Sequence, residues 1–265
     1  MTHRAPLDDE DVAPGDGSPE DEGVLNRPFA VLPETPCPYL PGLYERKLVT
    51  DLSGVDAADA YNVLSRAGFR RSHRFAYRPA CRACSACIPA RVVAPEYRRS
   101  KNLKRVARKN ADLQATLAPP VATPEQFALF ARYMDARHGG GEMADMTFGE
   151  FVALIEETAV STRVAELRRP DGELAGACIL DLLDDGVSAV YSFYDPDVPD
   201  RSLGTFIIDW LIHVTARRNR RNVYLGYWVP QAPKMAYKRR FQPLEVRVGG
   251  AWQRLDRMHG PVTGA

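Results

Sequence analysis

The clearest hydrophobic pattern in the chain is an apolar stripe at helical spacing between residues 203 and 217. Its members stand at i, i+3, i+4, i+7, i+8 and i+11 and are Leu203, Phe206, Ile207, Trp210, Leu211 and Val214. This spacing predicts a helix over 203–217 with one face in the core. Apolar runs at 187–194 and 223–228 predict a strand on either side of it, and a lysine-bearing segment follows at 233–238.

The rest of the C-terminal half alternates strands with two capped helices. Thr123, Pro124 and Gln126 form a capping box that predicts a helix ending near His138, and a second box at Thr147 predicts a helix to about residue 157. A glycine run at 139–141 connects the two helices. Further strands are predicted at 161–167, 173–183 and 244–248. Antiparallel hairpins feeding a helix and another strand are typical of the acyltransferase fold of N-acetyltransferases.

The N-terminal half begins with an acidic segment that lacks large apolar side chains. Residues 1–26 are therefore predicted to be a disordered acidic tail, because they cannot offset their ordering entropy by burial. Strands are predicted at 45–52, 69–78, 88–94 and 112–117, and helices at 56–67 and 100–110. Pro119 and Pro120 mark the predicted boundary, which gives an N-terminal cysteine-bearing, basic domain over 27–120 and a C-terminal domain over 121–255. The expected fold class is α+β, and the C-terminal domain is expected to be an acetyltransferase-like (GNAT-like) mixed sheet flanked by helices.

Composition and charge narrow the class of partner. The chain has 265 residues, 45% of them hydrophobic, which is long enough for two modest cores. The net charge of +1 hides a basic body, because eight acids and one arginine lie in residues 1–23. A polyanionic partner therefore becomes plausible. No apolar run is long enough for a membrane span and no secretory signal opens the chain, so we expect a cytoplasmic protein with no membrane partner.

A dense run of cations at 98–109 points to nucleic acid. It holds seven basic side chains within twelve residues and no acid, and Lys104, Arg105 and Arg108 are the central candidates for phosphate contacts. RNA is favoured over duplex DNA, because no helix-turn-helix or zinc-finger spacing is present and tyrosines stand nearby for base stacking. The alternative is a solvated helix face without a ligand.

Four cysteines form a candidate metal site. Cys81, Cys84 and Cys87 are spaced C-x2-C-x2-C, and Cys37 is the obvious fourth thiolate. In a cytosolic chain such cysteines are more often metal ligands than disulfides, and the set suits structural zinc or an iron–sulfur cluster. Unmetallated thiols in a loop are the alternative. Cys178, alone in an apolar strand, is expected to be a core residue.

The start of the 203–217 helix is a candidate anion site. Ser202 and Gly204 stand where a strand gives way to this helix, so that free backbone N–H groups and the positive end of the helix dipole are available to a phosphate. The alternative is a glycine that only eases a tight turn. No Walker loop, G-x-S-x-G elbow or H-E-x-x-H motif is present, so no nucleotide cofactor is expected. An enzyme of this kind would position an already activated acyl donor.

Several longer motifs, in order, carry a family resemblance. They are CPYLPG from Cys37, FAYRPACRACSAC from Phe75, DRSLGTF from Asp200, and YLGYWV with KMAYK between Tyr224 and Lys238. Over roughly residues 27–250 the chain resembles the bacterial leucyl-tRNA–protein transferases, also called aspartate/glutamate leucyltransferases, which are relatives of the eukaryotic arginyl-tRNA–protein transferases. The resemblance implies transfer of leucine from leucyl-tRNA to the N-terminal Asp or Glu of an acceptor protein, which marks that protein for the N-degron (N-end rule) route.

The resemblance also suggests roles for individual residues. Asp195 or Tyr237 would manage the proton of the attacking amine, with Lys234 near the terminal adenosine phosphate that Ser202 and Gly204 bind. The remaining substrate-binding candidates flank the same cleft in sequence and are Tyr191, Ser192, Tyr227 and Lys238. Arginyl-tRNA as donor, an acyl-CoA-dependent N-acetyltransferase and a non-catalytic RNA-binding module remain the alternatives.

Arg78 is the candidate for choosing an acidic acceptor. An acceptor that begins with Asp or Glu presents a carboxylate beside its amine, and a planar guanidinium binds a carboxylate through two hydrogen bonds. Alternation places Arg78 opposite Phe75 and Tyr77 on its strand, next to Pro79 and the cysteines. A contact from Arg78 to tRNA phosphate is the competing interpretation.

Overall fold

The computed structural model describes residues 27–138 and 145–258, and two sheets organise them. The predicted acidic tail over 1–26 and the glycine connection at 139–141 lie outside the described residues. The larger sheet has eight strands in the order β14-β13-β7-β12-β11-β10-β9-β8. These strands are β7 (Ile88–Val93), β8 (Gln114–Ala118), β9 (Thr162–Arg168), β10 (Leu174–Leu183), β11 (Gly186–Tyr194), β12 (Asn222–Trp228), β13 (Leu244–Val248) and β14 (Ala251–Arg254).

A second, smaller sheet, a short strand pair and the helices make up the rest of the fold. A four-stranded sheet has the order β1-β4-β6-β5, and a short pair joins β2 to β3. These strands are β1 (Phe29–Val31), β2 (Thr35–Pro36), β3 (Tyr44–Glu45), β4 (Lys47–Asp51), β5 (Arg70–Ser72) and β6 (Phe75–Pro79). The α-helices are α2 (Ala57–Arg66), α3 (Lys101–Lys109), α4 (Pro124–His138), α5 (Phe148–Glu156) and α6 (Leu203–Arg217). The 3-10 turns are η1 (Ala94–Glu96), η2 (Pro199–Arg201), η3 (Pro233–Arg240) and η4 (Leu255–Arg257).

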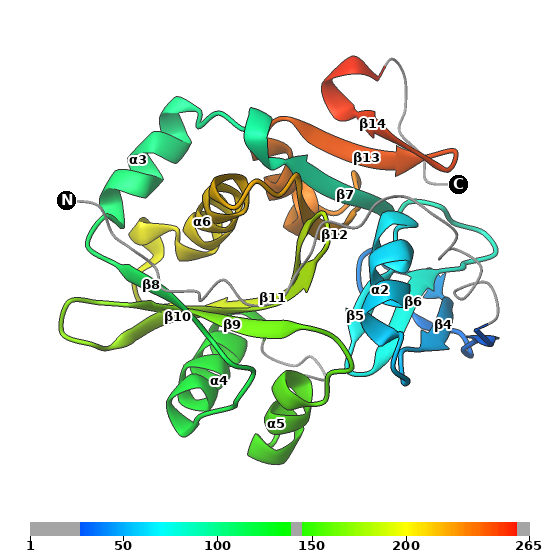
Figure 1. The fold of residues 1–265 in the computed structure, drawn as a ribbon, viewed down its shortest axis with the longest axis horizontal. Coiled ribbons are helices and arrows are strands. Elements are labelled where there is room, and N and C mark those ends of the chain that lie inside the picture. Colours follow the sequence, from blue (N-terminus) through cyan, green and yellow to red (C-terminus); the bar gives the residue numbers. More distant parts are fainter. Residues whose placement is uncertain (1–26, 139–144, 259–265) are drawn as a thin grey trace.

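Helices cover both faces of the large sheet (Figure 1). Helix α6 lies on one face with α3 beside it, and α4 and α5 lie on the other, while α2 packs with the four-stranded sheet. The expected α+β class with a large mixed sheet flanked by helices is confirmed. Among the described residues no helix is both long and apolar enough to cross a membrane.

Local signals predicted the helices well. Helix α6 has the predicted bounds, Ser100 accepts a hydrogen bond from the Leu103 N–H at the start of α3, and both capping boxes are formed. Each of these features depends on residues within one or two helical turns, which explains why the sequence alone showed them.

The predicted single strand over 69–78 is wrong. The structure has a hairpin instead, in which Ser72 pairs with Phe75 and two residues, His73 and Arg74, make the turn. His73 takes a positive φ of 51°, which a tight two-residue hairpin turn requires. Because the alternation of residue types continues across the two turn residues, the sequence pattern gave no sign that the chain reverses there.

The large sheet takes strands from both halves of the sequence. Strand β7 lies between β12 and β13, and β8 pairs with β9. The boundary predicted at Pro119 and Pro120 therefore does not coincide with a division between sheets. One face of strand β7 is fully buried, with Ile88, Ala90 and Val92 all at most 1% exposed, whereas Pro89 and Arg91 on the other face are half-buried.

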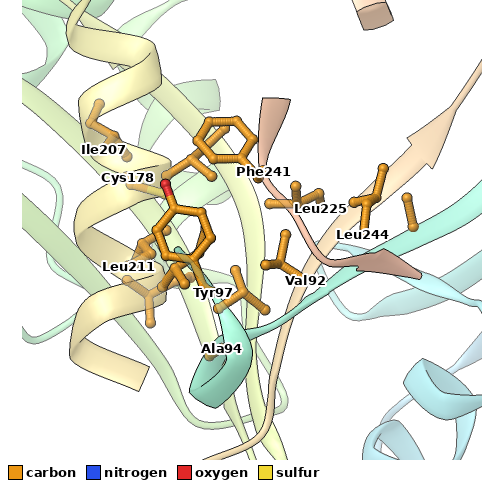
Figure 2. Packing of buried hydrophobic residues seen from close by; sticks show 14 of the residues in the cluster. Val92, Ala94, Tyr97, Cys178, Ile207, Leu211, Leu225, Phe241 and Leu244 are labelled. Carbon is orange, nitrogen blue, oxygen red and sulfur yellow. The ribbon is translucent and has the colours of Figure 1, made fainter. Parts of the chain in front are cut away.

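The main core lies between α6 and the large sheet. Figure 2 shows Ile207 and Leu211 of α6 facing Val92, Leu225 and Leu244 of the strands. Cys178 belongs to the same cluster and is 1% exposed, so its prediction as a core residue is confirmed.

A buried ion pair joins the two sheets. The guanidinium of Arg71 on β5 donates from Nε and Nη2 to the two carboxylate oxygens of Asp181 on β10, both at 2.8 Å. Both side chains are fully buried. Thr162 adds a third hydrogen bond to the same carboxylate, at 2.8 Å. Removal of either charge would leave the other unpaired in the interior.

Candidate active site

A parallel pairing within the large sheet opens a gap beside α6. Strands β11 and β12 pair over Gly186–Ser188 and Asn222–Tyr224 and then diverge. A cavity of about 400 Å³, here called the helix cavity, lies at the ends of β11, α6 and η3. It brings together six predicted residues, which are Ser192, Asp195, Ser202, Gly204, Lys234 and Tyr237.

The first turn of α6 is shaped for an anion. Ser202 precedes the helix in the left-handed conformation, with φ 52° and ψ 48°, and its side chain caps no helix N–H. Gly204 lies so close to the ring of Tyr194 that a Cβ at this position would stand 2.6 Å from Cε1. The N–H groups of Thr205 and Phe206 already donate to the Ser202 carbonyl, at 3.0 and 3.1 Å, so the N–H groups of Leu203 and Gly204 and the helix dipole are what this turn offers to an anion.

Cations surround the same cavity. Lys234 and Arg240 come from η3 and Arg137 from α4. Among the described residues none of the three has a carboxylate within ion-pair distance, and Arg137 lies over the ring of Tyr194 at 5.9 Å. A cavity with unpaired cations at a helix N-terminus suits a phosphate-bearing ligand.

Asp195 is held by other groups of the protein. Its Oδ1 accepts hydrogen bonds from Arg132 at 2.9 Å and from the Asp197 N–H at 3.0 Å, and its Oδ2 pairs with Arg169. Burial tends to raise its pKa, but the Asp197 N–H and the two arginines outweigh burial and lower the pKa below 3.8. A carboxylate held in this way is a weak base, which argues against a proton-accepting role for Asp195 and for a role in fixing the cavity rim.

Tyr237 offers a protonated phenol to the cavity. Burial raises its pKa above the ordinary 10.0, and Arg70 only partly opposes this effect. The hydroxyl therefore stays a hydrogen-bond donor near neutral pH. Tyr191 does not line the helix cavity: its hydroxyl lies 3.3 Å from the sulfur of Met134, and its ring packs against Phe130.

A second cavity, of about 360 Å³, is here called the cysteine cavity. All four predicted cysteines line it, namely Cys37, Cys81, Cys84 and Cys87. Burial and the three neighbouring thiols raise the pKa of Cys87 from 9.0 to about 12. The structure thus places Cys37 in the same cavity as the other three.

The four thiols are suitable metal ligands by their chemistry, but their side chains lie too far apart in this structure to share one metal ion. Four thiols in one cavity are a donor set for zinc or an iron–sulfur cluster. In the described part of the chain, however, no three His, Cys, Asp or Glu side chains stand close enough together to hold a metal ion. Metal binding would require the thiols to move closer together.

Arg78 and Lys47 are the cations of the cysteine cavity. Lys47 pairs with Glu45 at 2.8 Å. Arg78 is exposed and stacks over Phe69 at 5.2 Å, and among the described residues no carboxylate lies within ion-pair distance of it. Arg78 therefore remains able to bind an external carboxylate.

Tyr227 and Lys238 make hydrogen bonds at the end of β12. The Tyr227 hydroxyl lies within hydrogen-bond distance of the carbonyls of Tyr77, at 3.0 Å, and Gly68, at 3.2 Å. Lys238 is 2% exposed and donates to the Tyr227 carbonyl. Burial and then Arg70 lower the pKa of Lys238 well below 10.5. Tyr227 lines the cysteine cavity, whereas Lys238 lines neither cavity.

Arg70 fills the gap where β11 and β12 diverge. Its Nη2 donates to the carbonyls of Val190, at 2.8 Å, and Ala189, at 3.0 Å, on β11. Its Nη1 reaches the Leu225 carbonyl on β12 at 3.4 Å. Gly226 makes this possible, because a Cβ there would stand 1.4 Å from Nη1. The guanidinium thus bridges backbone carbonyls on both diverging strands.

An open groove of about 630 Å³ runs along α3. Lys104 and Arg108 line it with Arg99 and Lys101, and the small side chains of Ala107 and Ala111 form its apolar part. Arg105 is exposed but lies outside this groove. Arg99 also pairs with the buried Asp209 of α6, so part of its charge is already compensated.

Sequence reasoning missed several residues of the helix cavity. Tyr133 and Arg137 come from α4, and no sequence motif links α4 to the start of α6. Arg240 lies two residues after the KMAYK motif, so its position next to that motif could have indicated it.

Comparison with known proteins finds two family models and several curated relatives that match this chain. The family model described as "Arginine-tRNA-protein transferase, N terminus" matches residues 35–105, and the corresponding C-terminus model matches residues 125–248. A relative from Paramagnetospirillum magneticum, named "Aspartate/glutamate leucyltransferase", is 48% identical over 89% of this chain and 97% of its own length. A second of the same name, from Rhodospirillum rubrum, is 48% identical over 91% and 99%.

Among solved structures, "The structure of L-PGS from Bacillus licheniformis" resembles this chain with a TM-score of 0.41 and 12% identity, covering 64% of this chain and 49% of that one. The family models and the curated relatives cover most of the chain, and by them the chain belongs to the arginine-tRNA-protein transferase family.

Proposed function

We propose that this protein transfers leucine from leucyl-tRNA to the N-terminal Asp or Glu of acceptor proteins and so marks them for the N-degron route. The observation that carries the proposal is the helix cavity, where cations with no carboxylate partner among the described residues meet the N-terminus of α6. The relatives named as leucyltransferases favour leucine over arginine as the donor amino acid. A cytoplasmic location belongs to the same proposal, because aminoacyl-tRNA is made in that compartment.

The reaction needs no covalent enzyme intermediate. The neutral α-amine of the acceptor attacks the carbonyl carbon of the leucyl ester, and a tetrahedral oxyanion forms. The ester C–O bond then breaks, the amide remains, and the amine proton passes to the released ribose hydroxyl. The protein has to align the two substrates and stabilise the oxyanion.

Tyr237 is our assignment for the oxyanion donor. Its phenol is protonated, half-buried and at the cavity wall. Removal of one such donor typically lowers kcat about 100- to 1,000-fold. A Tyr237→Phe variant should therefore lose kcat on this scale while it retains binding of leucyl-tRNA, and single-turnover kinetics measure the two separately.

The phosphate of the terminal adenosine is assigned to the first turn of α6. Ser202 and Gly204 would contribute the hydroxyl and the backbone N–H groups, with Lys234 as the nearby cation. Asp195 takes no proton in this scheme, because its two arginine partners keep it ionised.

The acceptor is assigned to the cysteine cavity. Arg78 would hold the acidic side chain, and the tyrosines lining the same cavity would pack along the peptide. Arg82, exposed and outside the cavity, is a matched control. We expect Arg78→Ala to slow transfer to Asp- and Glu-initiated peptides while leucyl-tRNA still binds normally. Weakened tRNA binding with intact acceptor preference would contradict this assignment.

The four cysteines are proposed to bind zinc or an iron–sulfur cluster when the thiols draw together. Their role would be to stabilise the loops around the cysteine cavity. Protein purified without oxygen should carry metal by elemental analysis, and Cys84→Ser should reduce it. Metal-free protein with full activity would contradict the proposal.

One assay tests the function as a whole. The protein is incubated with labelled leucyl-tRNA, arginyl-tRNA or acetyl-CoA, together with peptides that begin with Asp, Glu or Ala. We expect label from leucyl-tRNA on the first two peptides alone. Label from arginyl-tRNA or from acetyl-CoA would support one of the alternatives.

A further inference from the structure

The turn before α6 is tied to the end of α3 by a network of hydrogen bonds. Asn110, fully buried, donates from Nδ2 to the Arg201 carbonyl at 2.8 Å and accepts at Oδ1 from Arg201 Nε at 3.0 Å. Arg201 also donates to the Lys109 carbonyl at 3.2 Å and pairs with Asp112. Lys109 donates to the Asp200 carbonyl at 3.0 Å. These contacts fix η2 against α3.

The residue that follows this turn needs such support. Ser202 adopts a left-handed conformation that is uncommon for a residue with a side chain and costs free energy. Such a conformation persists only when its surroundings determine it. The Ser202 N–H bonds to the Pro199 carbonyl at 3.1 Å, so the position of η2 sets the position of Ser202 and of the first turn of α6.

The end of α3 that contacts η2 also borders the α3 groove. Arg108 and Ala111 line that groove, while Pro199 and Ser202 line the helix cavity. Figure 1 shows α3 beside α6, and η2 connects the two features in space. An RNA whose backbone lies in the groove could therefore pass its 3′ end over η2 into the helix cavity.

We propose that Asn110 and Arg201 are positioning residues, which hold the anion-binding turn of α6 in a fixed relation to the RNA-binding face of α3. This inference rests on the proposed function of the helix cavity. Neither side chain lines the helix cavity or the α3 groove, and they act through Ser202 and Gly204. Their loss should let the turn relax, which would misplace the aminoacyl ester without removing any group that contacts RNA.

The test is Asn110→Ala, with Asn222→Ala as a matched control. Asn222 is 2% exposed, and its side-chain amide donates to Asp185 at 2.8 Å. It is the first residue of β12 and follows the C-terminal end of α6, whereas Ser202 precedes the N-terminal end. We expect Asn110→Ala to lower kcat about 10- to 100-fold with little change in KM for leucyl-tRNA. The control should retain kcat even where both variants lose similar stability.

A minimal donor, a leucyl ester of a short CCA oligonucleotide, separates positioning from RNA affinity. It enters the helix cavity but is too short for the α3 groove. Asn110→Ala should lower kcat with this donor as well, whereas Lys104→Ala should affect the full tRNA alone. If Asn110→Ala proves insoluble, Arg201→Met makes the same test, because its side chain is 21% exposed and leaves no buried cavity.

The outcomes distinguish the two proposals. Equal kcat for Asn110→Ala and wild type overturns the positioning role. A loss confined to KM for full-length tRNA also overturns it, because Asn110 would then serve RNA affinity. Wild-type protein that transfers nothing from leucyl-tRNA contradicts the proposed function itself.

Discussion

Replacement of Gly204 by alanine tests the close approach of α6 to the wall of the helix cavity. The new Cβ would stand 2.6 Å from Cε1 of Tyr194 and 3.0 Å from Cζ. Carbon atoms in contact lie about 3.5–4.0 Å apart, so the ring has to move by about 1 Å. The Tyr194 ring also contacts the tilted ring of Tyr133, with centroids 4.8 Å apart, so it has to press on Tyr133 or swing into the cavity.

Gly149 supplies a control at the equivalent helix position. It is the second residue of α5, as Gly204 is of α6, and a Cβ there would meet only Thr147 Oγ1, at 4.0 Å. Both variants gain up to about 1 kcal/mol from replacing a helical glycine. Only Gly204→Ala adds an overpacking cost of about 1–3 kcal/mol. The propensity gain cancels between the two variants, so their stabilities should differ by about 1–3 kcal/mol.

Urea unfolding and the leucine-transfer assay together measure the result. We expect Gly149→Ala to be slightly stabilised and fully active. Gly204→Ala should be the less stable of the two and should transfer leucine at least about tenfold more slowly, because about 1.4 kcal/mol of misplaced binding corresponds to that factor. Equal stability and equal activity of the two variants would refute the close-approach argument.

Three further predictions follow from the ion pairs and the groove. Arg71→Met should cost about 3–5 kcal/mol in urea unfolding by leaving Asp181 unpaired, and an added Asp181→Leu should recover much of it; no recovery would contradict the buried-pair interpretation. The pKa of Asp195 is lowered in the folded state, so its ionised carboxylate stabilises the fold above about pH 3.8, and this stabilisation is lost as pH falls through the folded-state pKa. The difference in unfolding free energy between wild type and Asp195→Asn should therefore shrink in acid. A difference that grows in acid would contradict this interpretation. Lys104→Ala with Arg108→Ala should reduce the slope of log affinity for tRNA against log salt by about 0.7–0.9 for each phosphate that the variant no longer neutralises, and an unchanged slope would indicate a solvated face.

The candidate site was only partly predictable. Ser202, Gly204, Lys234 and Tyr237 were chosen from motifs and do meet in one cavity. Asp195 also lines it, but its pairing with arginines from α4 and the β9–β10 turn could not be read from spacing. Tyr191 alternates with Ser192 along β11, so it faces the opposite side of the sheet and packs on α4.

The sequence by itself determined the features that depend on near neighbours. Helix α6 follows from a 3.6-residue period, the capping boxes from residues three apart, and the grouping of Cys81 with Cys84 and Cys87 from short spacing. The hairpin at His73 shows the limit of such local reasoning, because one residue at positive φ reversed a strand whose pattern read as continuous.

Only the tertiary structure decided which distant segments meet. Strand β7 enters the sheet between β12 and β13, Arg70 closes the gap beside Gly226, and Asn110 fixes the turn before Ser202. Each of these contacts joins residues about 90 or more positions apart. These long-range contacts form together when the strands and helices bury their apolar faces against one another. No hydrophobic period or motif within one segment specifies which distant segment will pack against it.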